Sequence, residues 1–163
     1  MFPVFNKVNN DTSTNGHIKY PSLENFKQKN VNDYIFQFGS KVMVMTEKLH
    51  GSNGQIDVTL DEDGSVLIRL GRRNDWIGHK EKFYNFQKVV EKLEENITTM
   101  VRKIAHSHGV NAIKIHIYGE IFGGGYNGKT NGIQCQKGVH YGPENDFAVF
   151  DIVINGNYQA WDV

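Results

Sequence analysis

The 163-residue sequence contains a single cysteine, Cys135. One cysteine cannot form an internal disulfide, and it excludes a zinc site built from several cysteines. No apolar run approaches the roughly 20 residues that a membrane-spanning helix requires. Residues 1–7 also lack the pattern of a secretory signal peptide. Together these absences predict a soluble protein of a cytoplasmic or other intracellular compartment.

The sequence has no net charge, because 18 Lys and Arg residues balance 18 Asp and Glu residues. A strongly basic nucleic-acid-binding domain is therefore excluded, and any nucleic-acid contact has to be local. The most basic and aromatic stretch is residues 69–88, which suits phosphate contacts and base stacking. Within it, Phe83 and Phe86 also fit the apolar face of a following helix, and we favour a core position for both.

The hydropathy pattern predicts one α+β domain over residues 1–163, in which antiparallel strands form a curved sheet against one long helix. Hydrophobic residues make up 39% of the chain, enough for one core. Period-two alternation predicts strands, and apolar residues three and four apart predict a helix. The predicted strands are 55–60, 65–70, 112–120 and 147–154, and the predicted helix is 80–107, ended by Gly109.

Shorter signals fill the remainder of the chain. Asn155-Gly156 predicts a hairpin turn, followed by a strand that begins near residue 158. The polar residues 6–16 predict a loop, and Ser22 is a candidate N-cap for a short helix. Residues 128–145 predict a long, glycine-rich connection.

Residues 46–54 read Thr-Glu-Lys-Leu-His-Gly-Ser-Asn-Gly and lie between the apolar run 42–45 and the strand 55–60. One interpretation is a hairpin, because Asn53-Gly54 is a common two-residue turn. Lys48 would then be an ordinary solvated lysine. In the other interpretation, Lys48 at a strand end is a covalent nucleophile. That role requires a fixed position and neighbours that lower its pKa, because only the unprotonated amine attacks phosphorus or a carbonyl.

Two further polar residues are predicted at strand ends, Glu120 and Asp151. Each has an ordinary structural interpretation, and so does Phe150, which alone would more often be a core residue than a stacking platform. The glycines 123–125 are not followed by Gly-Lys-Ser/Thr or by a helical pattern. Neither a Walker loop nor a dinucleotide fingerprint is therefore supported.

Several of these stretches resemble one known family. Residues 47–53 resemble the nucleotidyltransferase signature Lys-x-(His/Asp)-Gly-x-(Asn/Arg), in the form found in the RNA ligase 2 family of ATP-dependent ligases. Residues 118–123 are similar to that family's Gly-Glu-hydrophobic-hydrophobic-Gly motif, and residues 146–152 are similar to the motif that follows. Residues 138–142 are also typical of the family. The motifs keep the family's order over roughly residues 18–154.

The resemblance implies the ligase and mRNA-capping type of nucleotidyltransferase fold, which is ATP-grasp-like. It implies that Lys48 attacks the α-phosphate of ATP and forms a lysyl-AMP intermediate. His50 and Asn53 would serve the later steps, in which AMP passes to an RNA 5′-phosphate and a 3′-hydroxyl seals the break. The partner would be RNA with 5′-phosphate and 3′-OH ends, in particular a nicked duplex. Mg²⁺ or Mn²⁺ would neutralise phosphate charge, and the sequence assigns no metal ligand.

The resemblance also implies an AMP-binding set. Glu120 would accept hydrogen bonds from the ribose hydroxyls, and Phe150 would stack on adenine. Glu47 would lie at the adenine edge. Arg73 would contact the AMP ribose or the nick phosphate, with Arg72 as the neighbouring alternative.

The sequence departs from the family after Asp151, where two later motifs have no counterpart. One motif helps to bind metal, and the lysines of the other grip the triphosphate. We therefore expect a domain truncated at its C-terminus, either a fragment or a natural half-protein, that self-adenylylates poorly or not at all on its own. We also expect an exposed sheet edge that permits self-association.

Two other functions stay open at this point. A related DNA ligase or capping-type nucleotidyltransferase shares the lysine chemistry, although His50, Asn53 and the Phe-Ala-Val-Phe-Asp run favour an RNA ligase. A catalytically inactive nucleotide- or RNA-binding module is favoured by the missing motifs and disfavoured by the retention of Lys48. Small ligases of this kind resemble phage and viral repair enzymes.

Overall fold

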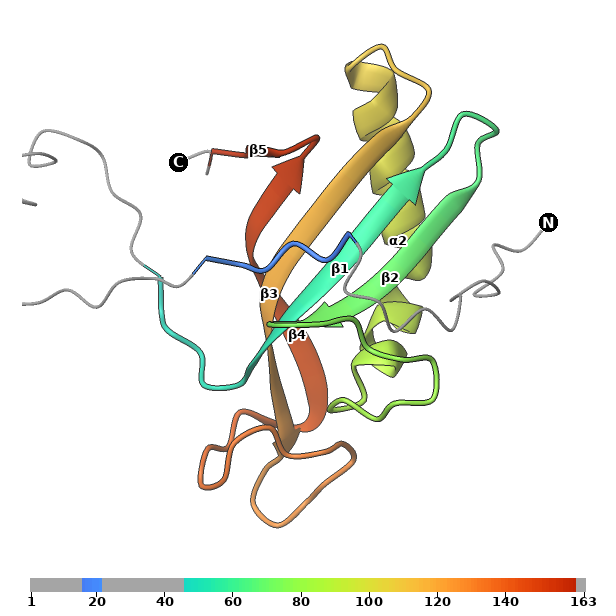
Figure 1. The fold of residues 1–163 in the computed structure, drawn as a ribbon. Coiled ribbons are helices and arrows are strands. Elements are labelled where there is room, and N and C mark those ends of the chain that lie inside the picture. The colour runs from blue at the N-terminus through green and yellow to red at the C-terminus, as the bar shows by residue number, and fades with distance from the viewer. Residues whose placement is uncertain (1–15, 22–45, 161–163) are drawn as a thin grey trace, which may run out of the picture.

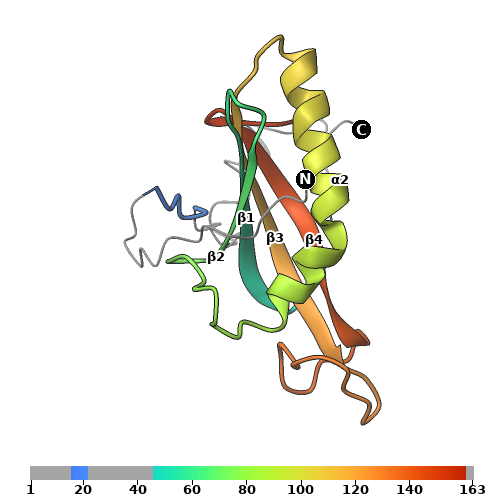
Figure 2. The same cartoon turned by 90° about the vertical axis from the view of Figure 1, so that its right-hand side faces the viewer.

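The computed structural model describes residues 16–21 and 46–160, which form an open antiparallel sheet with one helix along one face (Figures 1 and 2). The sheet order is β2-β1-β3-β4-β5. The strands are β1 (Ser52–Leu60), β2 (Val66–Arg72), β3 (Ile113–Gly125), β4 (Gly142–Ile154) and β5 (Asn157–Tyr158). The helix is α2 (Phe86–Ser107). The predicted α+β class is thus confirmed.

Two hairpin turns join neighbouring strands, and one of them is the predicted turn at Asn155-Gly156. Residues 61–65 close β1 onto β2, with Asp61 N–H donating to the Ser65 carbonyl at 3.0 Å. Asn155 and Gly156 close β4 onto β5, and both have positive φ, as a type I′ turn requires. The predictions for the loop 6–16, for the Ser22 N-cap and for the apolar run 42–45 fall outside the described residues.

The helix α2 ends as predicted but begins six residues later. Gly109 has φ 64°, and the N–H of Val110 donates to the carbonyl of Ala105, so the chain turns out of the helix there. At the other end, Tyr84 and Asn85 have φ of 47° and 56°, which no right-handed helix contains. Phe83 continues the helical spacing of apolar residues because it packs against the core from the preceding loop.

Asn53-Gly54 is not a hairpin turn, so the turn interpretation of that pair is wrong. Both residues lie inside β1, where Asn53 pairs with Glu120 and Gly54 pairs with Gly119. Gly54 serves packing: a Cβ there would lie 2.9 Å from the Ile121 side chain and 3.1 Å from the Phe147 ring. Glycine in a strand interior marks such a close approach.

The strand β3 extends beyond its predicted end and β4 begins before its predicted start, and neither Glu120 nor Asp151 is at a strand end. Glu120 lies five residues before the end of β3, and Asp151 lies three residues before the end of β4. Glycine-rich residues 123–125 continue β3 because they pair with β4 from Gly142 onward. The predicted connection 128–145 is therefore shorter, and the loop that joins the strands spans residues 126–141.

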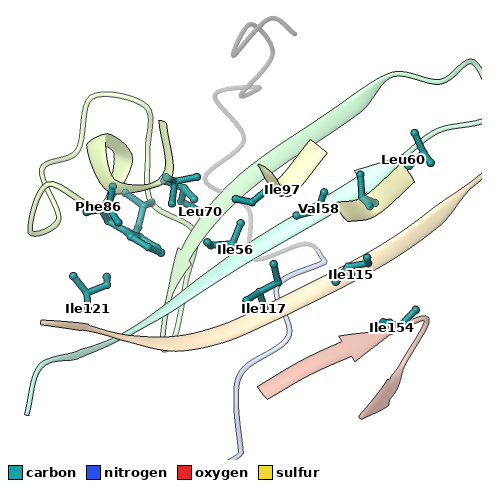
Figure 3. Close-up of a cluster of buried hydrophobic side chains, with 14 of the residues drawn as sticks. Ile56, Val58, Leu60, Leu70, Phe86, Ile97, Ile115, Ile117, Ile121 and Ile154 are labelled. Carbon is teal, nitrogen blue, oxygen red and sulfur yellow. The ribbon is translucent and has the colours of Figure 1, made fainter. Parts of the chain in front are cut away.

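The hydrophobic core lies between α2 and one face of the sheet, as Figure 3 shows. Alternation along β1 and β3 supplies the sheet side of this core. The fully or nearly fully buried members include Ile56, Val58, Phe86, Val90, Val101, Ile115 and Ile121. Phe86 belongs to this core, as expected, with its ring centroid 5.0 Å from that of Phe147. The other face of the sheet is crossed by residues 16–21 (Figure 2).

Candidate active site

The segment 46–51, which carries Lys48, is seated directly on the backbone of β3. A Cβ atom at Gly51 would lie only 2.0 Å from the carbonyl oxygen of Ile121. Glycine is therefore required at this position by the close approach of two backbones, since φ of Gly51 is not positive. The N–H of Gly51 donates to Glu120 Oε1 at 2.9 Å. Lys48 itself is exposed, three residues before this anchor.

The loop 126–141 holds the same segment from a second side. Gln136 Nε2 donates to the Gly51 carbonyl oxygen at 2.7 Å. The hydroxyl oxygen of Tyr141 accepts the backbone N–H of His50 at 3.0 Å. With the Glu120 contact, three hydrogen bonds fix the backbone next to Lys48. A nucleophile requires such a fixed position.

Glu120 links the lysine segment to the sheet. Burial raises the pKa of its carboxyl group, whereas the Gly51 N–H and the charges of Lys48 and His50 act in the opposite direction. The Gly51 contact holds the chain against the carboxylate, with His50 one residue and Lys48 three residues before it. Asn53 is the direct pairing partner of Glu120 across β1 and β3. The predicted residues Lys48, His50, Asn53 and Glu120 are thus brought together.

A β-bulge places Phe150 near the same site. Tyr118 pairs with Asp151 and Gly119 pairs with Val149, so Phe150 is an extra residue in β4. Bulges redirect side chains and occur often next to active sites. The Phe150 ring meets the ring of Tyr20 at a centroid distance of 4.9 Å, on the sheet face opposite α2. The sequence predicted the candidate role of Phe150 but not the bulge.

Tyr20 is a site residue that the sequence did not reveal. Its hydroxyl donates to the Asp151 carboxylate, and its ring also packs on Tyr118 at 5.0 Å. The Tyr118 hydroxyl in turn donates to the carbonyl oxygen of Ile18 at 3.0 Å. Burial, followed by the Asp151 contact, raises the pKa of Tyr20, so the hydroxyl is protonated and acts as a donor at neutral pH. Tyr20 lies within the part of the chain that resembles the family, roughly residues 18–154, but no local pattern in the sequence marks it as a site residue.

The two candidate arginines have different surroundings. Arg72 forms ion pairs with Asp75 and Glu81 beside the end of β2. These bonds hold the pKa of Asp75 below its usual range and orient the guanidinium within the loop. Arg72 therefore stabilises the connection formed by residues 73–85. Arg73 is exposed and follows the Gly54–Arg72 pair, so its backbone is at the same end of the sheet as Asn53.

Glu47 is exposed in the segment before β1, next to Lys48. Among residues 16–21 and 46–160, no three His, Cys, Asp or Glu side chains gather as metal ligands.

A buried polar group occupies the same sheet face, farther along β1 and β3. Asp57 and His116 are 2% and 3% exposed, and the 2.8 Å between Asp57 Oδ1 and His116 Nδ1 does not have hydrogen-bond direction. Gln55 lies 3.4 Å from the same ring nitrogen. The alternation Gln55-Ile56-Asp57-Val58 signals this polar face, which the sequence reasoning did not use.

Within the part of the chain that the structure describes, no helix has both the length and the apolar character needed to cross a bilayer. A comparison with known families matches residues 41–163 to the RNA ligase family. The chain therefore belongs to the RNA ligase family, and a general role in RNA ligation follows from that membership. A search of curated proteins gives no match.

Proposed function

We propose that this chain is the nucleotidyltransferase part of an ATP-dependent RNA ligase, with Lys48 as the residue that carries AMP. The observation that carries the proposal is the seating of the Lys48 segment on β3 through Gly51, beside Glu120. This arrangement presents an exposed amine from a fixed backbone, next to a carboxylate that suits a ribose diol. The open antiparallel sheet with one helix is compatible with the ligase and capping-enzyme fold.

In the first step, the unprotonated Nζ of Lys48 attacks the α-phosphorus of ATP. The new N–P bond forms as the bond between the α-phosphorus and the bridging oxygen breaks, and pyrophosphate leaves with the electron pair. Phe150 stacks on the adenine, Glu120 accepts from the ribose hydroxyls, and Glu47 lies at the adenine edge. Lys48 loses one ammonium proton to solvent before attack, and its nitrogen loses a second proton to solvent once the N–P bond has formed. The family resemblance and the shared location of these residues support the assignment.

The later steps use the same end of the sheet. An oxygen of the RNA 5′-phosphate displaces Lys48 from the AMP phosphorus, and the RNA 3′-hydroxyl then displaces AMP. A role for His50 and Asn53 in these steps is supported by their positions, because each lies next to the Glu120 and Gly51 contact. Arg73 would contact the ribose or the nick phosphate. Mg²⁺ or Mn²⁺, bound through the phosphates, would neutralise charge on the transferring group.

The test is intact-mass detection of an AMP adduct after a long incubation with ATP and magnesium. The wild-type chain is expected to gain one AMP group slowly, and Lys48→Arg is expected to gain none. Lys103→Arg is the matched control because Lys103 is an exposed lysine on α2. Incubation with GTP in place of ATP separates an RNA ligase from a guanylyl-transferring capping enzyme.

RNA that already carries AMP on its 5′-phosphate provides a second readout. This substrate needs no lysyl-AMP, so Lys48→Arg is expected to join it to a 3′-hydroxyl without ATP. His50→Ala or Asn53→Ala is expected to slow this joining. Failure of the wild-type chain in both assays, with ATP still bound, would replace the proposal with a nucleotide-binding module.

A further inference from the structure

The loop 126–141 has a local charge that the whole chain lacks. It contains Lys129, Lys137 and His140 and no Asp or Glu, in a protein whose net charge is zero. All three side chains are exposed. Within residues 16–21 and 46–160, neither lysine lies within ion-pair distance of a carboxylate. The loop therefore presents positive charge that is available to an external anion.

The tip of the loop pairs one of these cations with an aromatic ring. The N–H of Tyr126 donates to the Lys129 carbonyl at 2.9 Å, and the N–H of Lys129 donates to the Tyr126 carbonyl at 2.8 Å. Asn127 and Gly128 between them have φ of 47° and 75°, which makes a type I′ turn. Residues paired in this way project their side chains from the same face, roughly 5.5 Å apart. Tyr126 is 45% exposed, and Lys129 is also exposed. The ring and the ammonium group are therefore both accessible to solvent.

The loop is anchored to the sheet by the side chain of Asn145, which is only 8% exposed. Its Oδ1 accepts the N–H of Ile133, and its Nδ2 donates to the carbonyl of Ile133, both at 2.8 Å. The N–H of Cys135 donates to the Gly123 carbonyl at 3.1 Å. A loop fixed in this way loses little conformational entropy when it binds a partner.

The loop is also joined to the segment that carries Lys48. Gln136, next to Lys137, donates to the Gly51 carbonyl, and Tyr141, next to His140, accepts from the His50 N–H. Figures 1 and 2 show the loop at the end of the sheet where β1 begins. A partner bound along the loop is therefore brought to the candidate active site.

We propose that the loop 126–141 is an RNA-binding element of this chain. Tyr126 stacks on a base, Lys129 contacts the phosphate attached to that nucleotide, and Lys137 contacts a phosphate nearer to Lys48. A ring and an ammonium side by side match the alternation of base and phosphate along a strand. An acidic protein would need the cations but not the adjacent exposed ring. This inference rests on the proposed function only for the identity of the bound polynucleotide as RNA.

The experiment is fluorescence anisotropy with a labelled nicked RNA duplex that carries unpaired nucleotides on which Tyr126 can stack, measured without ATP over a range of salt concentrations. Each phosphate contact contributes about 0.7 to 0.9 to the slope of log affinity against log salt. Lys129→Gln with Lys137→Gln is expected to reduce the slope by about 1.4 to 1.8 and the affinity by about 10- to 30-fold at 0.15 M salt. Arg102→Gln with Lys103→Gln removes the same charge from exposed positions on α2 and is expected to change neither quantity.

Tyr126→Ala and Tyr126→Phe test the stacking contact separately from the charge. The alanine variant is expected to bind at least about 5-fold more weakly, and the phenylalanine variant is expected to retain wild-type affinity. The proposal is overturned if the wild-type chain does not bind the duplex or if the two double variants behave alike. It is also overturned if polyglutamate competes as well as RNA while Tyr126→Ala has no effect, which would indicate an acidic protein partner. Because no ATP is present, none of these results depends on adduct formation at Lys48.

Discussion

Gly51 allows a single methyl group to test the arrangement of the candidate active site. In Gly51→Ala the new Cβ would lie 2.0 Å from the Ile121 carbonyl oxygen, whereas real Cβ contacts are essentially never shorter than 3.0 Å. The segment and β3 must therefore separate by about 1 Å, and both neighbours of the clash are backbone. The movement stretches the 2.9 Å Gly51–Glu120 bond and the 2.7 Å Gln136–Gly51 bond. Lys48 is displaced with them.

The expected cost follows from these displacements. Overpacking of this kind costs about 1–3 kcal/mol of stability, and a misplacement of about 1 Å at a reacting group can cost about 100-fold in rate. We expect Gly51→Ala to slow AMP adduct formation by about that factor. The measurement is a time course of intact mass with ATP and magnesium, alongside urea unfolding.

Gly142→Ala is the matched control for Gly51→Ala. A Cβ at Gly142 meets no atom within 4 Å, and φ there is not positive. This variant is expected to keep the wild-type rate and stability within about 0.5 kcal/mol. If Gly51→Ala reacted within 3-fold of wild type, the lysine segment would not be seated on β3 as described, and the reasoning would be refuted.

Substitutions at three further positions separate binding from stability. Burial raises the pKa of the Glu120 carboxyl group, so the folded protein binds that proton more tightly than the unfolded chain does. The free energy of unfolding therefore falls as the pH rises from the unfolded pKa through the raised pKa of the folded state. Glu120→Gln is therefore expected to weaken ATP binding in calorimetry, yet unfold in urea no more easily than wild type above that window; a large loss of stability would contradict this. Phe150→Ala should weaken ATP binding about 5-fold or more while Phe150→Tyr retains it; equal affinities would argue against stacking. Tyr20→Phe removes the hydrogen bond to Asp151 but keeps the ring, so it should lower stability by about 1 kcal/mol with ATP binding nearly unchanged, whereas Tyr20→Ala should weaken ATP binding because Phe150 loses its neighbour.

Local sequence signals predicted the elements whose structure depends on neighbouring residues. The end of α2 at Gly109 and the turn at Asn155-Gly156 follow from glycine and asparagine in left-handed conformations. Apolar spacing located α2, but it placed the start too early because Phe83 contacts the core from a loop. A side chain can satisfy the helical spacing without belonging to the helix.

The errors arose where distant parts of the chain meet. Asn53-Gly54 has the composition of a turn, but Gly54 lies in β1 because Phe147, about ninety positions away, packs over it. Likewise, the extension of β3 beyond Glu120 depends on pairing with residues from Gly142 onward. Such long-range contacts override local turn propensity and cannot be read from a short window.

The candidate site likewise combines residues that the sequence indicated with residues that only the structure revealed. The family motifs indicated Lys48 and Glu120, and the structure places their segments in contact through Gly51. The contributions of Tyr20 and Tyr141 required the structure, because each comes from a segment far from Lys48 in the sequence. Their roles depend on hydrogen bonds to the backbone or to a carboxylate, for which no local pattern is typical.

The most direct test of the central claim is to locate the AMP group in the wild-type chain after incubation with ATP and magnesium. Peptide mapping by mass spectrometry identifies the modified residue, and Lys48→Arg serves as the control. The account predicts an acid-labile AMP group on Lys48 alone, absent from the variant. An AMP group on another lysine, or an equal yield from Lys48→Arg, would contradict it.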